Sequence, residues 1–173
     1  MIRHPNLIIF LGTMLEEDNN LCIVTEYCKG GTLFDLLHKK KNINLPWNLR
    51  LRILIDISKA MNFLHTNNPQ IIHSDLKSLN ILMTDEIKEN NVNNNVSIKI
   101  SDFGLSKIID KDKIVWESPQ GIVGSVQWMA PELLQNNCID NTKVDIYSFG
   151  IIIWEICTRV QPYKDMSAYQ IIN

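Results

Sequence analysis

The chain has 173 residues, of which 45% are hydrophobic and 21% are charged, and its formal net charge is −2. This length and balance are typical of one well-buried globular domain, or of part of a larger one. The slightly acidic balance argues against a nucleic-acid-binding protein, which usually carries a basic surplus. The most apolar run, YSFGIIIWEIC at residues 147–157, is too short to span a bilayer.

The cysteines form neither a Cys-x-x-Cys pair nor a zinc-binding spacing with histidine: Cys22, Cys28, Cys138 and Cys157. We expect reduced, mostly buried thiols, as in cytosolic or nuclear proteins. The first ten residues, MIRHPNLIIF, place proline and asparagine where a signal peptide needs an unbroken apolar stretch. A soluble protein of the cytoplasm, or of the nucleus, is therefore expected, with no membrane segment.

Two short β-branched runs, residues 7–15 and 21–27, flank a polar turn and predict a β-hairpin. Two glycines then break the second strand, and residues 32–41 predict a helix with Thr32 as N-cap and lysines at its end. Residues 46–65 predict a long amphipathic helix. Its apolar positions recur every three or four residues: Leu49, Ile53, Ile57, Met61 and Leu64.

The second half of the chain predicts small strands followed by one more helix. Strands are expected at residues 71–73, 80–84 and 97–101, with an asparagine-rich loop between the last two. A long loop at 102–132 and a very apolar helix at 145–158 follow. Two strands, then helices with small strands among them, predict an α+β fold.

The segment HSDLKSLN, residues 73–80, places polar side chains at a spacing suited to phosphoryl transfer. That reaction needs an acceptor for a hydroxyl proton, cations that neutralise the phosphate, and ligands that hold a metal ion. Asp75 can accept the proton, Lys77 can contact the transferred phosphate, and Asn80 can bind the metal. Asp102, which opens the sequence DFG after a short strand, supplies a second oxygen ligand for a hard divalent cation.

Six segments in order then resemble a eukaryotic protein kinase domain. They are HPNLI, IVTEY with GGTLFDLL, HSDLKSLNIL, DFGLSK, GSVQWMAPE and DIYSFGIIIWEI. The resemblance covers nearly the whole chain and is similar in texture to the tyrosine-kinase-like group of serine/threonine kinases. It implies a protein-kinase-like fold, truncated at both ends. Residues 1–27 would be a remnant of the small lobe (its last two strands), and residues 28–173 part of the mostly helical large lobe.

The resemblance also implies where a nucleotide binds. Thr25 falls at the gatekeeper position, Glu26 and Cys28 offer main-chain groups to adenine, Leu82 forms the pocket floor, and Asp35 stands where ribose is often bound. An extended backbone beside two glycines leaves donors and acceptors for a flat ligand. Without the downstream motifs, a plain strand and turn would be the simpler interpretation. ATP and Mg²⁺ are the implied cofactors.

Three further residues take structural roles by resemblance. His73 and Phe103 are similar to the pair that stacks between the lobes of an active kinase. Asp145 is similar to the buried aspartate that holds the catalytic loop. A buried carboxylate there needs main-chain N–H partners, a requirement that an ordinary helix N-cap also meets.

Lys77 and Ser125 indicate the substrate class. Serine/threonine kinases of this family usually have lysine two residues after the catalytic aspartate, and a Ser or Thr at the position of Ser125. Protein serine and threonine hydroxyls are therefore the expected acceptors, and dual specificity remains open.

Ser74 departs from the family, which mostly has arginine at this position. That arginine pairs with a phosphate on the activation loop, and serine cannot form such an ion pair. Lys107 would remain as half of the phosphate pocket. We expect activity to depend little on activation-loop phosphorylation, with Ser118 a weak candidate site.

Parts of a complete kinase domain are absent from the sequence. It contains no G-x-G-x-x-G loop and no V-A-x-K strand, so this chain alone is expected to be inactive. The arginine that pairs with Glu132 in the family is also missing, and an ionised Glu132 without it would be costly. Two hypotheses remain: part of an active serine/threonine kinase, or a pseudokinase or truncated interaction module.

Overall fold

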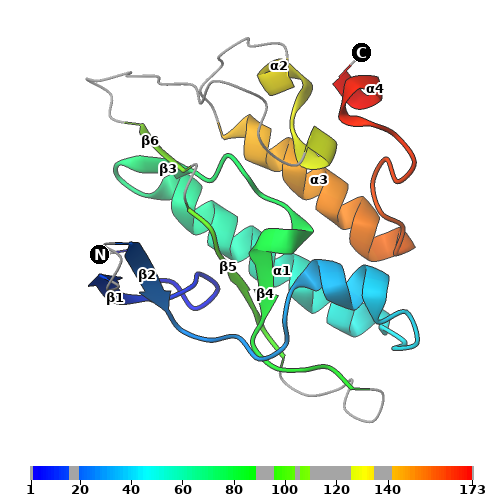
Figure 1. The fold of residues 1–173 in the computed structure, drawn as a ribbon, viewed down its shortest axis with the longest axis horizontal. Coiled ribbons are helices and arrows are strands. Elements are labelled where there is room, and N and C mark those ends of the chain that lie inside the picture. Colours follow the sequence, from blue (N-terminus) through cyan, green and yellow to red (C-terminus); the bar gives the residue numbers. More distant parts are fainter. Residues whose placement is uncertain are drawn as a thin grey trace.

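The structure, a computed structural model, describes residues 2–15, 20–88, 96–103, 106–109, 126–134 and 142–172. Its body is built around two helices, α1 (Trp47–Thr66) and α3 (Lys143–Thr158), which lie side by side (Figure 1). Both agree with the helices predicted from the sequence. Because apolar residues recur along α1 at helical spacing, one face enters the core, and all five predicted core positions are buried.

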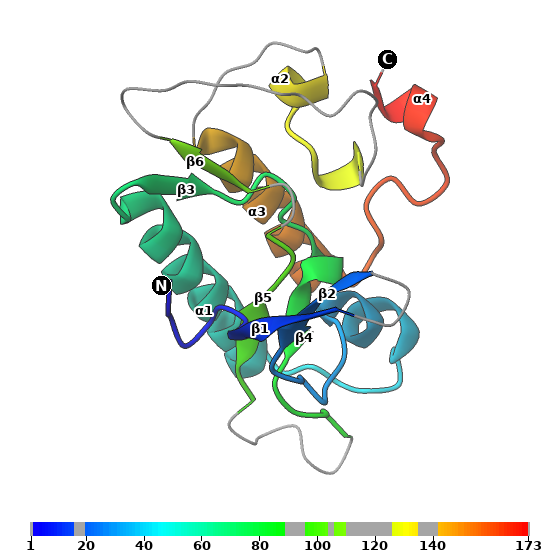
Figure 2. The same ribbon diagram turned by 60° about the vertical axis from the view of Figure 1, so that its left-hand side comes forward.

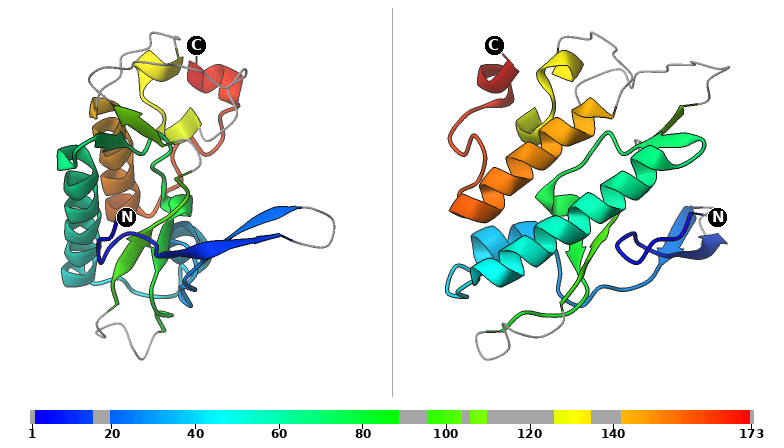
Figure 3. Two further views of the ribbon diagram at one scale, coloured as in Figure 1. Left: turned by 90° about the vertical axis from the view of Figure 1, so that its left-hand side faces the viewer. Right: turned by 180° about the vertical axis from the view of Figure 1, so that it is seen from behind.

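The predicted hairpin is confirmed by strands β1 (Phe10–Leu15) and β2 (Leu21–Thr25), which pair antiparallel. The hairpin stands away from the helical body (Figure 3, left). Its apolar side chains are accordingly exposed, with Leu11 at 63% and Ile23 at 72%. These strands are stabilised by their mutual main-chain hydrogen bonds and contribute little to the core.

Strands β4 (Ile81–Met83) and β5 (Ile98–Ile100) form an antiparallel pair between α1 and the hairpin (Figure 2). Residues 6–8 run parallel to β5, and the Ile8 N–H donates to the Ile100 carbonyl at 2.9 Å. Residues 29–32 run along β4 on its other side. The two small strands therefore connect the segments before and after the hairpin to the helical body.

Gly30 and Gly31 allow this close approach of two backbones. The Gly30 N–H donates to the Met83 carbonyl at 3.0 Å, and a Cβ on Gly30 would lie 2.3 Å from the Asp85 carbonyl oxygen. Gly31 has φ +74°, a left-handed conformation that glycine adopts without strain. The two glycines fix where the chain leaves β2 and reaches β4.

The third strand pair corrects the long loop expected at residues 102–132. β6 (Lys107–Ile109) lies inside that range and pairs antiparallel with β3 (Gln70–Ile72). Ile108 and Ile109 are β-branched and suit a strand, but a run of three residues is too short to show a period of two. Residues 107–109 are thereby paired with residues 70–72, directly before the segment that carries the predicted catalytic groups.

The helix predicted at residues 32–41 is shorter than expected, and its last turns are π-helical at Asp35–Lys39. Thr32 does cap it, because its hydroxyl accepts the Asp35 N–H at 3.0 Å. Among the described residues, α2 (Pro131–Leu134) and α4 (Ala168–Ile172) are two further short α-helices.

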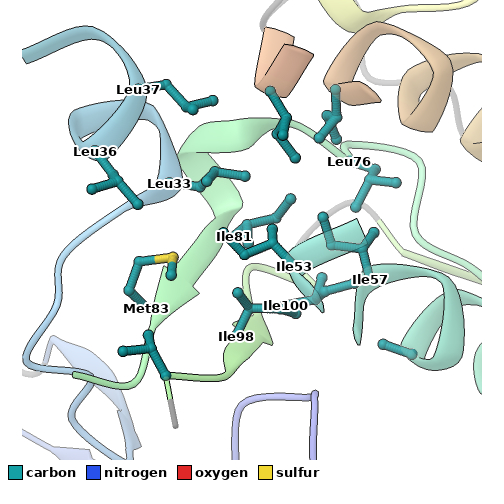
Figure 4. Packing of buried hydrophobic residues seen from close by; sticks show 14 of the residues in the cluster. Leu33, Leu36, Leu37, Ile53, Ile57, Leu76, Ile81, Met83, Ile98 and Ile100 are labelled. Carbon is teal, nitrogen blue, oxygen red and sulfur yellow. The ribbon is translucent and has the colours of Figure 1, made fainter. Parts of the chain in front are cut away.

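The main core lies between α1, the helix after Thr32, and the β4–β5 pair (Figure 4). Leu33, Leu37, Ile57, Ile81 and Ile100 are all completely buried. Full burial of each such side chain contributes about 1.5–3 kcal/mol. This core supports the loop from residue 73 to residue 80, which carries the predicted catalytic groups.

The prediction that the cysteines are mostly buried is wrong for the described ones. Cys28 is buried, Cys22 is half-buried and Cys157 is exposed, and these three are free thiols. Cys157 points outward because it lies at the end of α3, beyond the face that packs on α1. Among the described residues, no helix has the length and apolar character needed to cross a membrane.

Candidate active site

Asp145, in the first turn of α3, holds the start of the catalytic loop, which we define as residues 73–80. Its two carboxylate oxygens accept the His73 N–H and the Ser74 N–H, both at 2.9 Å, and His65 Nε2 lies 2.8 Å from Oδ2. The side chain is 1% exposed. The main-chain partners expected for this carboxylate are therefore present, and the buried group is fully hydrogen-bonded.

Ser74 is held in the left-handed region, at φ +66°. A non-glycine residue there costs about 1–2 kcal/mol. The hydrogen bond from its N–H to Asp145 helps to maintain this conformation. The result is a sharp turn in the backbone immediately before Asp75.

Asp75 is restrained by the two polar residues that follow it. Lys77 Nζ donates to Asp75 Oδ2 at 2.6 Å, and Asn80 Nδ2 donates to the same oxygen at 3.1 Å and to the Asp75 carbonyl at 2.9 Å. Oδ1 accepts no hydrogen bond from the described residues. One carboxylate oxygen is thus fixed by cationic and amide donors, and the other is available to accept a proton from a hydroxyl group.

His73 links the catalytic loop to the segment that contains Asp102. The Ser101 carbonyl lies 3.1 Å from His73 Nε2, and the Asp75 N–H donates to Nδ1 at 3.3 Å. The His73 and Phe103 rings lie 5.2 Å apart, so the predicted contact between them is present. Burial lowers the pKa of His73, although Asp145, Asp75 and Asp102 oppose the shift. A neutral ring is what this arrangement requires, because Nδ1 must remain an acceptor.

Asn80 and Asp102 are suited to hold a hard divalent cation. The Asn80 Nδ2 is used by Asp75, so the amide oxygen is the atom left for a metal. The Asp102 side chain is exposed, and its backbone has φ +63°, a conformation that aspartate tolerates better than most residues. The described residues contain no group of three or more His, Cys, Asp or Glu side chains that could hold a metal ion. A cation here would draw its other ligands from phosphate and water, as Mg²⁺ commonly does.

At the predicted adenine edge, Glu26 and Cys28 differ in which of their main-chain groups already have hydrogen-bond partners. The Glu26 N–H donates to the Ile9 carbonyl at 3.0 Å, and its carboxylate binds Lys99 Nζ at 2.7 Å. The Cys28 N–H and carbonyl have no hydrogen-bond partner within the described part of the chain. Burial, together with the charge of Glu26, raises the pKa of the Cys28 thiol. Cys28 therefore presents a free main-chain donor and acceptor, whereas the Glu26 N–H is already used; Thr25, next to it, is exposed.

Leu82 and Asp35 lie close to this edge through the pairing of residues 29–32 with β4. Thr32 and Leu82 are bridge partners, and Thr32 caps the turn that contains Asp35. A hydrogen bond from Lys39 at 2.7 Å, above all, lowers the pKa of Asp35. Leu82 therefore lies beside the segment that follows the adenine edge, and Asp35 comes seven residues after Cys28 in the sequence.

A shallow depression opens on the other side of Asp75. Its walls come from the catalytic loop, the segment before α2 and the start of α3: Ser74, Leu76, Trp128, Met129, Leu133 and Val144. Its lining is about as polar as it is apolar, and Asp75 is one of the lining residues. An extended peptide could place a hydroxyl group there.

Comparisons with known proteins agree with this geometry. The sequence profile of the protein tyrosine and serine/threonine kinase family matches residues 1–173. The chain belongs to this family. Similar proteins include a probable serine/threonine-protein kinase of Dictyostelium discoideum, 44% identical over 96% of this chain and 15% of the relative. The serine/threonine-protein kinase CTR1 of Arabidopsis thaliana is 39% identical over 99% of this chain and 19% of the relative.

The match confirms the resemblance to a eukaryotic protein kinase domain. A putative serine/threonine-protein kinase/receptor of Acanthamoeba polyphaga mimivirus is also 39% identical, over 96% of this chain and 10% of the relative. In all three cases, the segment matched by this chain spans less than a fifth of the relative's length. Kinases of this family use ATP and a divalent metal ion.

Several predicted kinase residues cannot be placed fully. Ser118 and Ser125 lie outside the described residues, as does the side chain of Lys107, although its backbone is in β6. Glu132 is half-buried in the single turn of α2. The roles of these four residues stay predictions.

A second buried carboxylate, Glu155, was not predicted from the sequence. It lies on α3 and is hydrogen-bonded to side chains from three separate segments, His38, Ser78 and Trp128. A signal was present, because Glu155 is a charged residue inside an otherwise apolar run, ten residues after Asp145. At 100° per residue, the two lie about 80° apart around the helix, and both are buried.

Proposed function

We propose that the protein containing this chain is a serine/threonine protein kinase. It transfers the γ-phosphoryl group of ATP, with Mg²⁺, to hydroxyl groups of protein substrates. The observation that carries the proposal is Asp75, with one carboxylate oxygen held by Lys77 and Asn80 and the other available beside an open depression. A binding module has no physical need for this arrangement.

Each step of the reaction has a residue suited to it. Asp75 orients the acceptor hydroxyl and takes its proton, and Lys77 contacts the transferred phosphate. Asn80 and Asp102 would hold Mg²⁺, which neutralises charge on the phosphates. Cys28 and Leu82 would bind the adenine ring, and Asp35 the ribose.

The choice of serine and threonine rests on Lys77 and on the relatives. Lys77 stands where serine/threonine kinases of the family have lysine, and the similar proteins carry that specificity in their names. Its hydrogen bond to Asp75 supports the proposal, because the ammonium group then lies beside the proposed proton acceptor.

Ser74 favours a second candidate, a pseudokinase that binds partners without catalysis. It also motivates a regulatory proposal, because a serine hydroxyl cannot pair with an activation-loop phosphate as arginine does. Activity of the intact protein would then persist without phosphorylation of that loop.

Asp75→Asn in the intact protein separates the two candidates. The substitution keeps the shape of the side chain but removes the proton acceptor, so kcat should fall at least about a hundredfold. Asp165→Asn, an exposed residue in a turn after α3, is the matched control and should leave kcat unchanged. Phosphate incorporation into a serine-containing protein is measured alongside nucleotide binding. An intact protein that binds ATP but transfers no phosphate above the Asp75→Asn background would support the pseudokinase.

A further inference from the structure

The helix α3 carries two buried carboxylates, and the proposed reaction accounts for only one of them. Asp145 holds His73 and Ser74 at the start of the catalytic loop. Glu155 is ten residues further along the same helix, about 15 Å along the axis. It is 0% exposed, and burying an ionisable group so completely is costly unless its partners are well placed.

Three side chains from distant parts of the sequence surround Glu155. The Ser78 hydroxyl donates to Oε1 at 2.7 Å, and the Trp128 indole N–H donates to Oε2 at 2.9 Å. His38 Nε2 lies 2.7 Å from Oε1, and since a carboxylate oxygen only accepts, this nitrogen carries a proton. Both oxygens of Glu155 are therefore occupied, and hydrogen bonds to charged groups are among the stronger ones in proteins.

Each partner of Glu155 belongs to a different part of the proposed active site. Ser78 is in the catalytic loop, directly after Lys77. Trp128 lines the depression beside Asp75, and its carbonyl accepts a further hydrogen bond from Ser148 of α3 at 2.7 Å. His38 lies in the helix that follows the adenine edge. Glu155 thus joins the three segments that would bind nucleotide, transfer phosphate and receive the substrate.

We propose that Glu155 is a positioning residue for phosphoryl transfer. It fixes the C-terminal end of the catalytic loop through Ser78, as Asp145 fixes the N-terminal end, and so sets the geometry of Asp75, Lys77 and Asn80 between them. Through Trp128 it also fixes the position of one wall of the substrate depression relative to the same loop. The inference rests on the proposed function for its catalytic consequence, but the structural restraint itself can be tested independently.

The restraint is tested by hydrogen exchange with Ser78→Ala in the intact protein. The Asn80 N–H is bonded to the Lys77 carbonyl at 2.9 Å, so its exchange reports opening of this turn. Peptides covering residues 77–83 should exchange about tenfold faster, since a buried carboxylate loses one donor. The peptide containing His73 and Ser74 should be unchanged, because Asp145 still holds those amides.

Ser58→Ala is the matched control, because its hydroxyl also bonds within the protein, to the Ile55 carbonyl at 2.8 Å, but on the exposed surface of α1. It should alter neither peptide. Trp128→Phe, which removes only the indole N–H from Glu155, is a second variant and should loosen residues 77–83 less than Ser78→Ala does. Trp154→Phe, at an exposed tryptophan of α3, is its control.

Steady-state kinetics then test the catalytic consequence. Ser78→Ala should lower kcat about tenfold and leave the KM for ATP within twofold, because the loop contacts the transferred group and not the adenine ring. Faster exchange confined to residues 77–83, together with a lower kcat and a nearly unchanged KM for ATP, supports the proposal. Unchanged exchange overturns it, and so does acceleration spread evenly over α1 and α3, which would mark a general loss of stability. If the unsubstituted protein transfers no phosphate, the proposed function fails, and the exchange data still decide the restraint.

Discussion

His73 uses both of its ring nitrogens inside the protein, and each has a different role. Nδ1 accepts the Asp75 N–H, while Nε2 faces the Ser101 carbonyl, which can only accept. The ring is completely buried and leans against Phe103. A single neutral tautomer satisfies all three contacts, so the position of Asp75 is connected to the protonation state of His73.

The stability of the protein should therefore fall as the pH drops below about 6.5, the ordinary pKa of histidine. Burial lowers the pKa of His73, so near and below 6.5 the unfolded chain binds this proton more readily than the folded one. The contribution of neutral His73 to the free energy of unfolding is fully present above pH 6.5 and is lost at lower pH. In urea unfolding, the free energy of unfolding should be lower at pH 5.5 than at pH 7.5, by about 1 kcal/mol for one such histidine.

The comparison with His73→Gln isolates this contribution, because glutamine does not titrate. The variant should lose less stability than the parent between the two pH values. The pKa of His4 is also lowered by burial, so His4→Gln should reduce the pH dependence in the same direction. Equal pH dependence in His73→Gln and the parent would contradict the prediction.

The sequence predicted individual residues well where their partners are near in the chain. Asp75, Lys77 and Asn80 span six residues, and their spacing alone indicates a common site. Glu155 was missed because its donors Ser78 and His38 lie 77 and 117 residues away. A contact over such a distance depends on how helices pack, which periodicity within one segment does not reveal.

At the scale of elements, two arginines join the helices by capping their ends. Arg50, on α1, donates to the Ile156 and Cys157 carbonyls at the end of α3, at 2.9 and 2.8 Å. Arg159, the residue after α3, donates to the carbonyls of Leu36 and Ile43 at 3.0 and 2.6 Å. Carbonyls at helix ends have no partner within their own helix, so these guanidinium groups replace water as donors. Each helix end is thereby fixed to its neighbour.

Arg159→Ala should lower the free energy of unfolding by about 2–3 kcal/mol, since several carbonyls lose a charged donor together. Arg159→Lys should recover less than half of this, because an ammonium group cannot reach carbonyls spread over residues 36–43 as the planar guanidinium does. Denaturant unfolding measures both. Arg52→Ala, at an exposed site on α1, is the control and should change stability by less than about 0.5 kcal/mol. If Arg159→Ala lowers the free energy of unfolding by no more than about 0.5 kcal/mol, a capping role is ruled out.

The long helices and three short strands were predicted from the sequence, namely β3, β4 and β5, whereas β6 was not. Twenty residues of α1 contain five turns of repeating apolar positions, and the predicted boundaries differ from the observed ones by a single residue at each end. β6 has three residues and owes its existence to pairing with β3. The helix after Thr32 was predicted, but its π-helical turns and early end depend on packing against α3 and on Arg159.

At the scale of the whole molecule, the α+β class and the order of the segments followed from the sequence, and the spatial relation of the hairpin to the body did not. The hairpin is connected to the large lobe through residues 6–8, residues 29–32 and the Glu26–Lys99 ion pair. Its two faces carry exposed apolar side chains, among them Leu11, Leu15 and Leu21. Such surface is usually covered by further protein.

The 173-residue chain expressed alone should therefore show no phosphoryl transfer above an Asp75→Asn background. Its described residues include the proposed proton acceptor Asp75, the proposed phosphate contact Lys77 and the two proposed metal ligands, Asn80 and Asp102. Its sequence contains no glycine-rich loop to cover the phosphates and no V-A-x-K strand to place a lysine on them. Without these groups the nucleotide would be held only along its adenine and ribose edge, and its γ-phosphate would not be oriented toward Asp75.

The phosphoryl-transfer activities of this chain and of the intact protein are compared at equal concentrations. The measurement is transfer of labelled phosphate to a serine-containing protein. Nucleotide binding by the chain, measured separately by calorimetry, should be weak but present, because Cys28 and Leu82 are in place. The intact protein provides the positive control, and its Asp75→Asn variant the background. Turnover by the chain within tenfold of the intact protein would show that the residues described here orient the phosphates by themselves. In that case Lys77 would have to perform the work that the family assigns to a second lysine.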